Sequence, residues 1–133
     1  MNTRLEAPAP PARILIVDDE PLNRELLEVM LAAEGYLLMS AGSGEAALEI
    51  VARRSPDLIL LDVMMPGMDG YQVVARIKAN PATKGIPVIL LTALDDRSSR
   101  AHGLSAGAED FLTKPVNRAD LYARVRSLLH LQA

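Results

Sequence analysis

The sequence predicts an α/β domain in which five parallel strands alternate with five helices. Short runs of apolar and β-branched residues recur along the chain, and helical patterns of apolar residues fill the intervals between them. The first, third and fourth runs are apolar almost throughout, which is typical of strands covered by helices on both faces. The chain has 133 residues, 50% of them hydrophobic, which is enough for one domain with a single core.

The elements follow one another without a long loop. The expected strands are the runs at 13–17, 36–41, 57–61, 87–91 and 109–113. The helix after the first strand opens at Pro21 and continues to Gly35, with apolar residues at helical spacing: Leu22, Leu26, Leu27, Met30 and Leu31. The remaining helices are expected from the cap Ser43, over 70–79, over 95–106 and from the cap Asn117.

Right-handed crossovers leave few topologies for such a chain, and the commonest is the doubly wound, flavodoxin-like (βα)5 order 2-1-3-4-5. In these sheets a ligand binds at the carboxyl ends of the strands, near the switch point between the first and third strands. We expect the domain to comprise residues 12–133. Residues 1–11 include an Ala-Pro alternation at 7–10, which indicates a flexible lead-in.

Composition excludes several classes of protein. The net charge of −3 is unlike that of a nucleic-acid-binding domain, and the absence of cysteine excludes disulfides and thiolate chemistry. Two histidines are too few for a zinc site. No apolar stretch is long enough for a membrane span, and the N-terminus does not resemble a signal peptide, so we expect a cytoplasmic protein that binds neither membrane nor nucleic acid.

Polar residues gather where the strands end. Asp18 and Asp19 follow the first strand and Asp62 follows the third, while Thr92 and Lys114 follow the fourth and fifth. A carboxylate at the tip of a buried strand is costly unless something uses it. Each residue alone could be a cap or a turn residue, but five of them on one rim indicate a site.

Three carboxylates together indicate a cation, since two of them about 5 Å apart repel by roughly 3 kcal/mol at an effective dielectric constant of 20. All-oxygen ligands favour a hard cation, Mg²⁺, with Mn²⁺ as an alternative. A metal ion beside Lys114 and the Thr92 hydroxyl would suit a phosphoryl group. The metal ion and the Lys114 ammonium could both neutralise the negative charge that develops on the phosphoryl oxygens. Asp62, central in the sheet, is the best candidate for a nucleophile that forms an acyl phosphate.

The motifs resemble those of the receiver domain of two-component response regulators, over nearly all of residues 12–130. The matching segments are the pair Asp18–Asp19, LLDVMMPGMDG with Asp62, LLTA with Thr92, and FLTKP with Lys114. The resemblance implies a switch that is phosphorylated by a histidine kinase or a phosphotransfer protein and that is not itself a conventional enzyme. It also implies a downstream output protein or fused domain as a second partner.

The resemblance also assigns the phosphoacceptor and the metal ligands. Asp62 would be the phosphoacceptor and Asp19 a direct Mg²⁺ ligand, with Asp18 acting mainly through water. The backbone carbonyl of Met64 would be a further ligand.

The same resemblance implies a readout of the phosphate. Thr92 would contact the phosphoryl group, and Lys114 would pair with it from a cis peptide bond to Pro115. Phe111 matches a switch aromatic that rotates inward when Thr92 moves. The surface formed by the fourth helix, the fifth strand and the fifth helix would then make output contacts or a homodimer.

Three residues are expected to tune the phosphate's lifetime. Met64 and Leu94 match positions that flank the phosphate in the family, and both are bulky and apolar here, so neither can orient an attacking water. We therefore expect slow self-dephosphorylation, unless both side chains merely cover the edge of the core. Ala93 is small, which keeps the approach to Asp62 open to a donor.

Two other functions fit these residues less well. Aspartyl phosphatases of the haloacid dehalogenase group need a second acid two residues after the nucleophile, where this chain has Met64. A flavin or nucleotide binder would need a glycine-rich loop after the first strand, where Asp18 and Asp19 would repel phosphate. An aromatic content of 3% also offers little for stacking a flavin.

Overall fold

The computed structural model describes residues 10–93 and 97–132. Its strands are β1 (Arg13–Val17), β2 (Leu37–Ala41), β3 (Leu58–Asp62), β4 (Val88–Thr92) and β5 (Asp110–Thr113). Its helices are α1 (Pro21–Ala32), α2 (Gly44–Arg54), α3 (Gly70–Ala79), α4 (Arg97–Ala106) and α5 (Arg118–Gln132). The expected start of the fourth helix at Asp95 and most of the expected lead-in at 1–11 lie outside the described residues.

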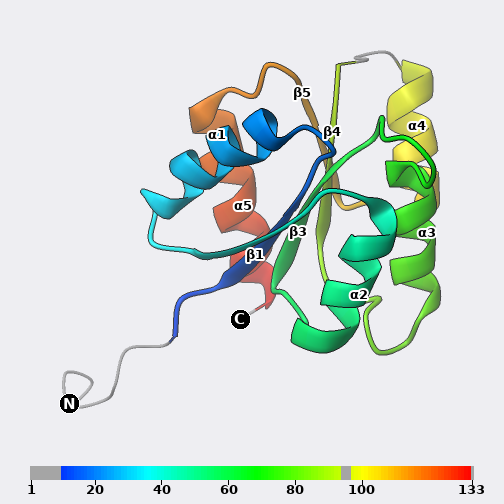
Figure 1. Ribbon diagram of the computed structural model, residues 1–133, viewed down its shortest axis with the longest axis horizontal. Helices are drawn as coiled ribbons and strands as arrows, with labels where there is room; N and C mark the ends of the chain where they lie inside the picture. The colour runs from blue at the N-terminus through cyan, green and yellow to red at the C-terminus, as the bar shows by residue number, and fades with distance from the viewer. Residues whose placement is uncertain (1–9, 94–96, 133) are drawn as a thin grey trace.

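The five strands form one parallel sheet in the order β2-β1-β3-β4-β5. Helices α1 and α5 cover one face, and α2, α3 and α4 cover the other (Figure 1). The predicted doubly wound, flavodoxin-like fold is therefore confirmed. β3 and β4 are each shifted by one residue from the sequence expectation, so that Asp62 and Thr92 are the last residues of these strands rather than the residues after them.

The core has two layers, one on each side of the sheet, because successive side chains of a strand point to opposite faces. On the α1 and α5 face, strand residues such as Ile16 and Leu60 pack with Leu31 and Val125. The other layer lies under α2, α3 and α4. All five residues of β3 and of β4 are buried, which explains why these segments are apolar up to their final residue.

The described helices include none that is both long and apolar enough to cross a membrane.

Candidate functional site

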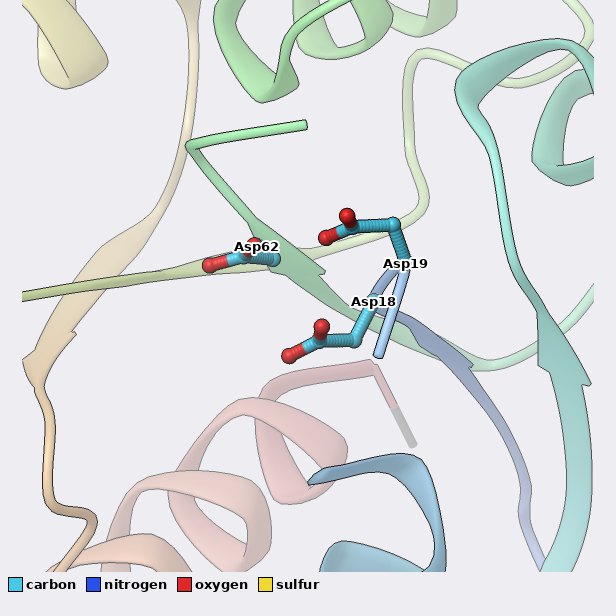
Figure 2. Close-up of side chains that lie close together, drawn as sticks. All are labelled: Asp18, Asp19 and Asp62. Carbon is cyan, nitrogen blue, oxygen red and sulfur yellow. The ribbon is translucent and has the colours of Figure 1, made fainter. Parts of the chain in front are cut away.

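Three carboxylates meet at the carboxyl edge of the sheet. Asp18 and Asp19 follow β1, Asp62 ends β3, and these two strands are neighbours. One oxygen from each carboxylate lies within 4.8 Å of the others, and the side chains reach toward the same space (Figure 2). Asp18 is 1% exposed and Asp62 4% exposed, so two of the three charges are largely removed from water.

Lys114 bridges two of these carboxylates. Its Nζ lies 2.8 Å from Oδ1 of Asp62 and 3.2 Å from Oδ2 of Asp18. The backbone holds the lysine in place, because its N–H donates to the carbonyl oxygen of Thr92 at 2.8 Å. The peptide bond from Lys114 to Pro115 is cis. The end of β5 thus brings the ammonium group onto the rim formed by β1 and β3.

The surroundings of Asp62 disfavour its charge. Burial raises the pKa of Asp62, Lys114 lowers it through a hydrogen bond and its charge, and the charges of Asp18 and Asp19 raise it again, with a net raised pKa. Burial acts to lower the pKa of Lys114, but the hydrogen bonds and charges of Asp62 and Asp18 outweigh it and raise that pKa. Three carboxylates facing one ammonium leave an excess of negative charge at the site.

The donor set fits a hard cation. Carboxylate oxygens from Asp18, Asp19 and Asp62 converge, and no nitrogen or sulfur ligand takes part in this group. Few protein oxygens and an excess negative charge suit Mg²⁺ or Mn²⁺, which keep several water ligands.

The chain turns back sharply after β3. Gly70 N–H donates to the carbonyl oxygen of Val63 at 2.9 Å, and α3 begins directly against the end of the strand. A Cβ on Gly70 would lie 2.5 Å from the carbonyl oxygen of Asp62, so only glycine fits. Asp69 caps α3 in a capping box with Gln72. Within this turn Met64 is 64% exposed.

The predicted readout residues lie along β4 and β5. Thr92 is fully buried at the end of β4, and Ala93 is exposed after it. Leu94 lies outside the described residues. Phe111 is 4% exposed and packs beneath Gly103 of α4, where a Cβ would approach the ring to 2.6 Å. The Phe111 ring therefore lies in the core in this structure, and α4 packs against it.

Sequence reasoning missed one residue near the site. Arg24 of α1 donates from Nη1 to the carbonyl oxygen of Asp18 at 2.7 Å. A basic residue one turn into the helix that follows an Asp–Asp pair could have suggested such a contact. Arg24 contacts a backbone oxygen, however, and a sequence pattern of side chains does not indicate where backbone oxygens point.

Comparison with known proteins agrees with this geometry. The family model of the response regulator receiver domain matches residues 14–126. The chain belongs to this family. Receiver domains act as phosphorylation-dependent switches in two-component signalling rather than as conventional enzymes, and they generally bind Mg²⁺ at an acidic cluster. Response regulators interact with histidine kinases and output domains.

Among its relatives, the receiver is 56% identical over 117 residues to the response regulator PleD of Caulobacter vibrioides, covering 88% of this chain and 26% of PleD. It is 41% identical to the probable transcriptional regulatory protein TcrX of Mycobacterium tuberculosis, covering 90% of this chain and 50% of TcrX. The chain thus spans between a quarter and a half of these two relatives.

Solved structures show the same fold. A putative response regulator from Chloroflexus aurantiacus superimposes with a TM-score of 0.87 at 41% identity, covering 90% of this chain and 98% of that chain. Chemotaxis protein CheY4 of Vibrio cholerae gives a TM-score of 0.84 at 29% identity, covering 89% of this chain and 98% of that chain.

Proposed function

We propose that this receiver accepts a phosphoryl group on Asp62 from a phosphohistidine of a histidine kinase or phosphotransfer protein. The observation that supports the assignment is the position of Asp62. It ends a central strand, faces Asp18 and Asp19, and is held by Lys114 at 2.8 Å. A nucleophile needs this combination of fixed position and adjacent positive charge. Residues 12–133 would form the receiver unit.

The reaction would be an in-line displacement at phosphorus. A carboxylate oxygen of Asp62 forms the new P–O bond while the P–N bond of the donor breaks, and that electron pair stays on the imidazole nitrogen. Lys114, already hydrogen-bonded to Asp62, would then pair with the phosphoryl oxygens. Thr92, one strand away on the same rim, would donate its hydroxyl to another of those oxygens.

Asp18, Asp19, Asp62 and the backbone carbonyl of Met64 would hold the cation, Mg²⁺ or Mn²⁺. When bound, it would offset the excess negative charge of the cluster and the charge that develops on the phosphoryl oxygens. Asp19 would be the direct ligand, with Asp18 acting mainly through water because its two oxygens already accept from Glu20 N–H at 2.9 Å and from Lys114 at 3.2 Å.

The phosphorylated state would be read through the surface formed by α4, β5 and α5. Added phosphoryl charge of about −1.5 to −2 would draw Thr92 and Lys114 toward it. Phe111 of β5 pairs with Leu90 of β4, and its ring packs against Gly103 of α4, so a shift of Thr92 would be passed to α4 through the packing of this ring. This surface would contact an output protein, a fused domain or a second copy of the receiver.

The aspartyl phosphate would be long-lived. Met64, two residues after Asp62, is exposed, and its thioether side chain would offer no group that orients an attacking water. Leu94 would act in the same way. Ala93, small and exposed, would leave room for the donor to approach Asp62. A half-life of seconds for the phosphorylated protein would contradict this part of the proposal.

Incubation with acetyl phosphate and Mg²⁺, followed by intact-mass spectrometry, tests the assignment. We expect one phosphoryl group on the wild-type protein and none on Asp62→Asn. The matched control is Asp120→Asn, the same chemical change at an exposed position in the first turn of α5. Phosphorylation of the Asp62→Asn variant at the wild-type rate would refute the proposal.

A further inference from the structure

Arg24 contacts the backbone of the site, although it is not among the residues that would touch the phosphoryl group or the cation. Arg24 is half-buried in the first turn of α1, and its Nη1 donates to the carbonyl oxygen of Asp18 at 2.7 Å. We infer that Arg24 is a positioning residue of the cation site, which sets the direction of Asp19 by holding the peptide group between Asp18 and Asp19. The inference rests on the proposed function, since it assumes that Asp19 is a ligand.

The contact completes a set that fixes Asp18 on every side. Its N–H donates to the carbonyl oxygen of Ala41 at 3.2 Å, and its carboxylate accepts from Glu20 N–H at 2.9 Å and from Lys114 at 3.2 Å. Arg24 adds the contact to the carbonyl oxygen. Because a peptide group is planar, fixing that oxygen also fixes the N–H of Asp19 and hence the starting point of its side chain.

A glycine leaves room for this arginine. Gly42 follows β2, and a Cβ added there would lie 3.2 Å from Nη1 of Arg24 and 3.8 Å from its Cζ. The φ of Gly42 is outside the left-handed region, so alanine is permitted by the backbone and only the space for Arg24 is at stake. A methyl group at Gly42 would push the guanidinium by a few tenths of an ångström without removing its charge.

Positioning and simple charge predict opposite results. A positive charge near a cation site repels the cation, so removing Arg24 would tighten Mg²⁺ binding if charge alone mattered. If Arg24 orients Asp19, removing it lets the peptide rotate and weakens binding. Loss of a residue that orients a metal ligand typically costs about 10-fold to 100-fold in affinity, and the lost repulsion would place Arg24→Met near the lower figure.

The first experiment titrates Mg²⁺ into the full chain and follows backbone amide resonances of the site by NMR. We expect Arg24→Met to weaken Mg²⁺ binding by about tenfold and Arg24→Lys, which keeps a donor and the charge, to recover most of the loss. Arg53→Met removes an exposed arginine of α2 and should leave the affinity unchanged. Unchanged or tighter binding by Arg24→Met would overturn the inference.

The second experiment uses Gly42→Ala in two backgrounds and remains informative if Arg24→Met folds poorly. In the wild-type background we expect about threefold weaker Mg²⁺ binding, and in the Arg24→Lys background a smaller loss, since the effect passes through the guanidinium. An equal loss in both backgrounds, or none in the wild type, would overturn the inference. A wild-type protein that binds no Mg²⁺ would instead refute the proposed site itself, so the two failures are distinguishable.

Discussion

The charge of Asp62 is favoured by Lys114 and opposed by burial and by two neighbouring carboxylates. At an effective dielectric constant of 20, the ammonium at 2.8 Å contributes about 6 kcal/mol of attraction. Asp18 and Asp19, with oxygens within 4.8 Å, each contribute at least about 3.5 kcal/mol of repulsion. Attraction and repulsion nearly cancel, so the cost of burying Asp62 stands unopposed.

Asp62→Asn should therefore stabilise the Mg²⁺-free protein, although it removes one partner of a buried ion pair. Lys114 keeps Asp18 at 3.2 Å, and the asparagine oxygen can still accept a hydrogen bond from it. We expect a gain of about 1 to 2 kcal/mol, because two repulsions and a buried charge are lost along with one attraction. For a domain of this size, that corresponds to a rise in Tm of roughly 3 to 8 °C.

The gain should depend on pH with a defined sign. The pKa of Asp62 is raised in the folded protein above its usual 3.8, so the folded state binds that proton more tightly than the unfolded state. At pH values above the raised pKa, the charge of Asp62 therefore lowers the free energy of unfolding of the wild type by its full amount. This destabilisation disappears as the pH falls toward 3.8. The stability difference between Asp62→Asn and wild type should shrink over the same interval.

Urea unfolding of the Mg²⁺-free proteins, repeated across this pH range, measures the difference. Asp120→Asn serves as control, since it makes the same change on the exposed start of α5 and should cost at most a few tenths of a kcal/mol. Adding Mg²⁺ should stabilise the wild type and so reduce or reverse the difference in free energy of unfolding between Asp62→Asn and the wild type. An Asp62→Asn variant less stable than wild type at neutral pH would show that the ion pair with Lys114 dominates, and would refute the reasoning.

Three further substitutions test the site's supports. Lys114→Met leaves two buried carboxylates without their ammonium, and should lower the free energy of unfolding without Mg²⁺ by about 3 kcal/mol, with partial recovery when Mg²⁺ is added. Gly70→Ala should cost about 2 to 3 kcal/mol by urea unfolding because its Cβ would meet the Asp62 carbonyl, whereas Gly85→Ala, with nothing within 4 Å, should be nearly neutral. Gly103→Ala should displace α4 from the Phe111 ring, which would shift the amide resonances of α4; unshifted resonances would contradict the close packing of Gly103 on this ring.

The fold and the rim of the site were predictable because both follow from short-range patterns. A strand buried on both faces is apolar almost throughout, and β3 and β4 each show this in four consecutive residues before Asp62 and Thr92. In a parallel sheet all carboxyl ends lie at one edge, so residues at strand ends meet without knowledge of the loops. Asp62 and Lys114 are 52 residues apart in sequence, yet topology alone placed them together, and the structure has them in contact.

Other features could not be predicted, because the same sequence pattern is compatible with different structures. The leucines of α1 have helical spacing, but Leu27 and Leu31 are buried while Leu22 is 76% exposed and Leu26 is 57% exposed. Periodicity shows that a face is apolar and does not show whether this protein covers it. The contact of Arg24 with a backbone oxygen was hidden for a different reason, since only the path of the β1–α1 loop brings that oxygen within reach.

Hydrogen bonds and close packing around Lys78 fix the amino ends of β4 and β5, opposite the site, and this bears on signalling. At the amino ends of β4 and β5, Lys78 donates to the carbonyl oxygen of Ile86 at 2.6 Å and to Glu109 at 2.8 Å. Glu109 in turn accepts from Val88 N–H at 2.7 Å, which ties β4 to the turn before β5. Lys78 also packs so close to Gly107 that a Cβ there would lie 2.7 Å from its Cγ, which fixes the end of α4. A rearrangement started by a phosphoryl group at the opposite edge would therefore move the first turns of α4 more than its last.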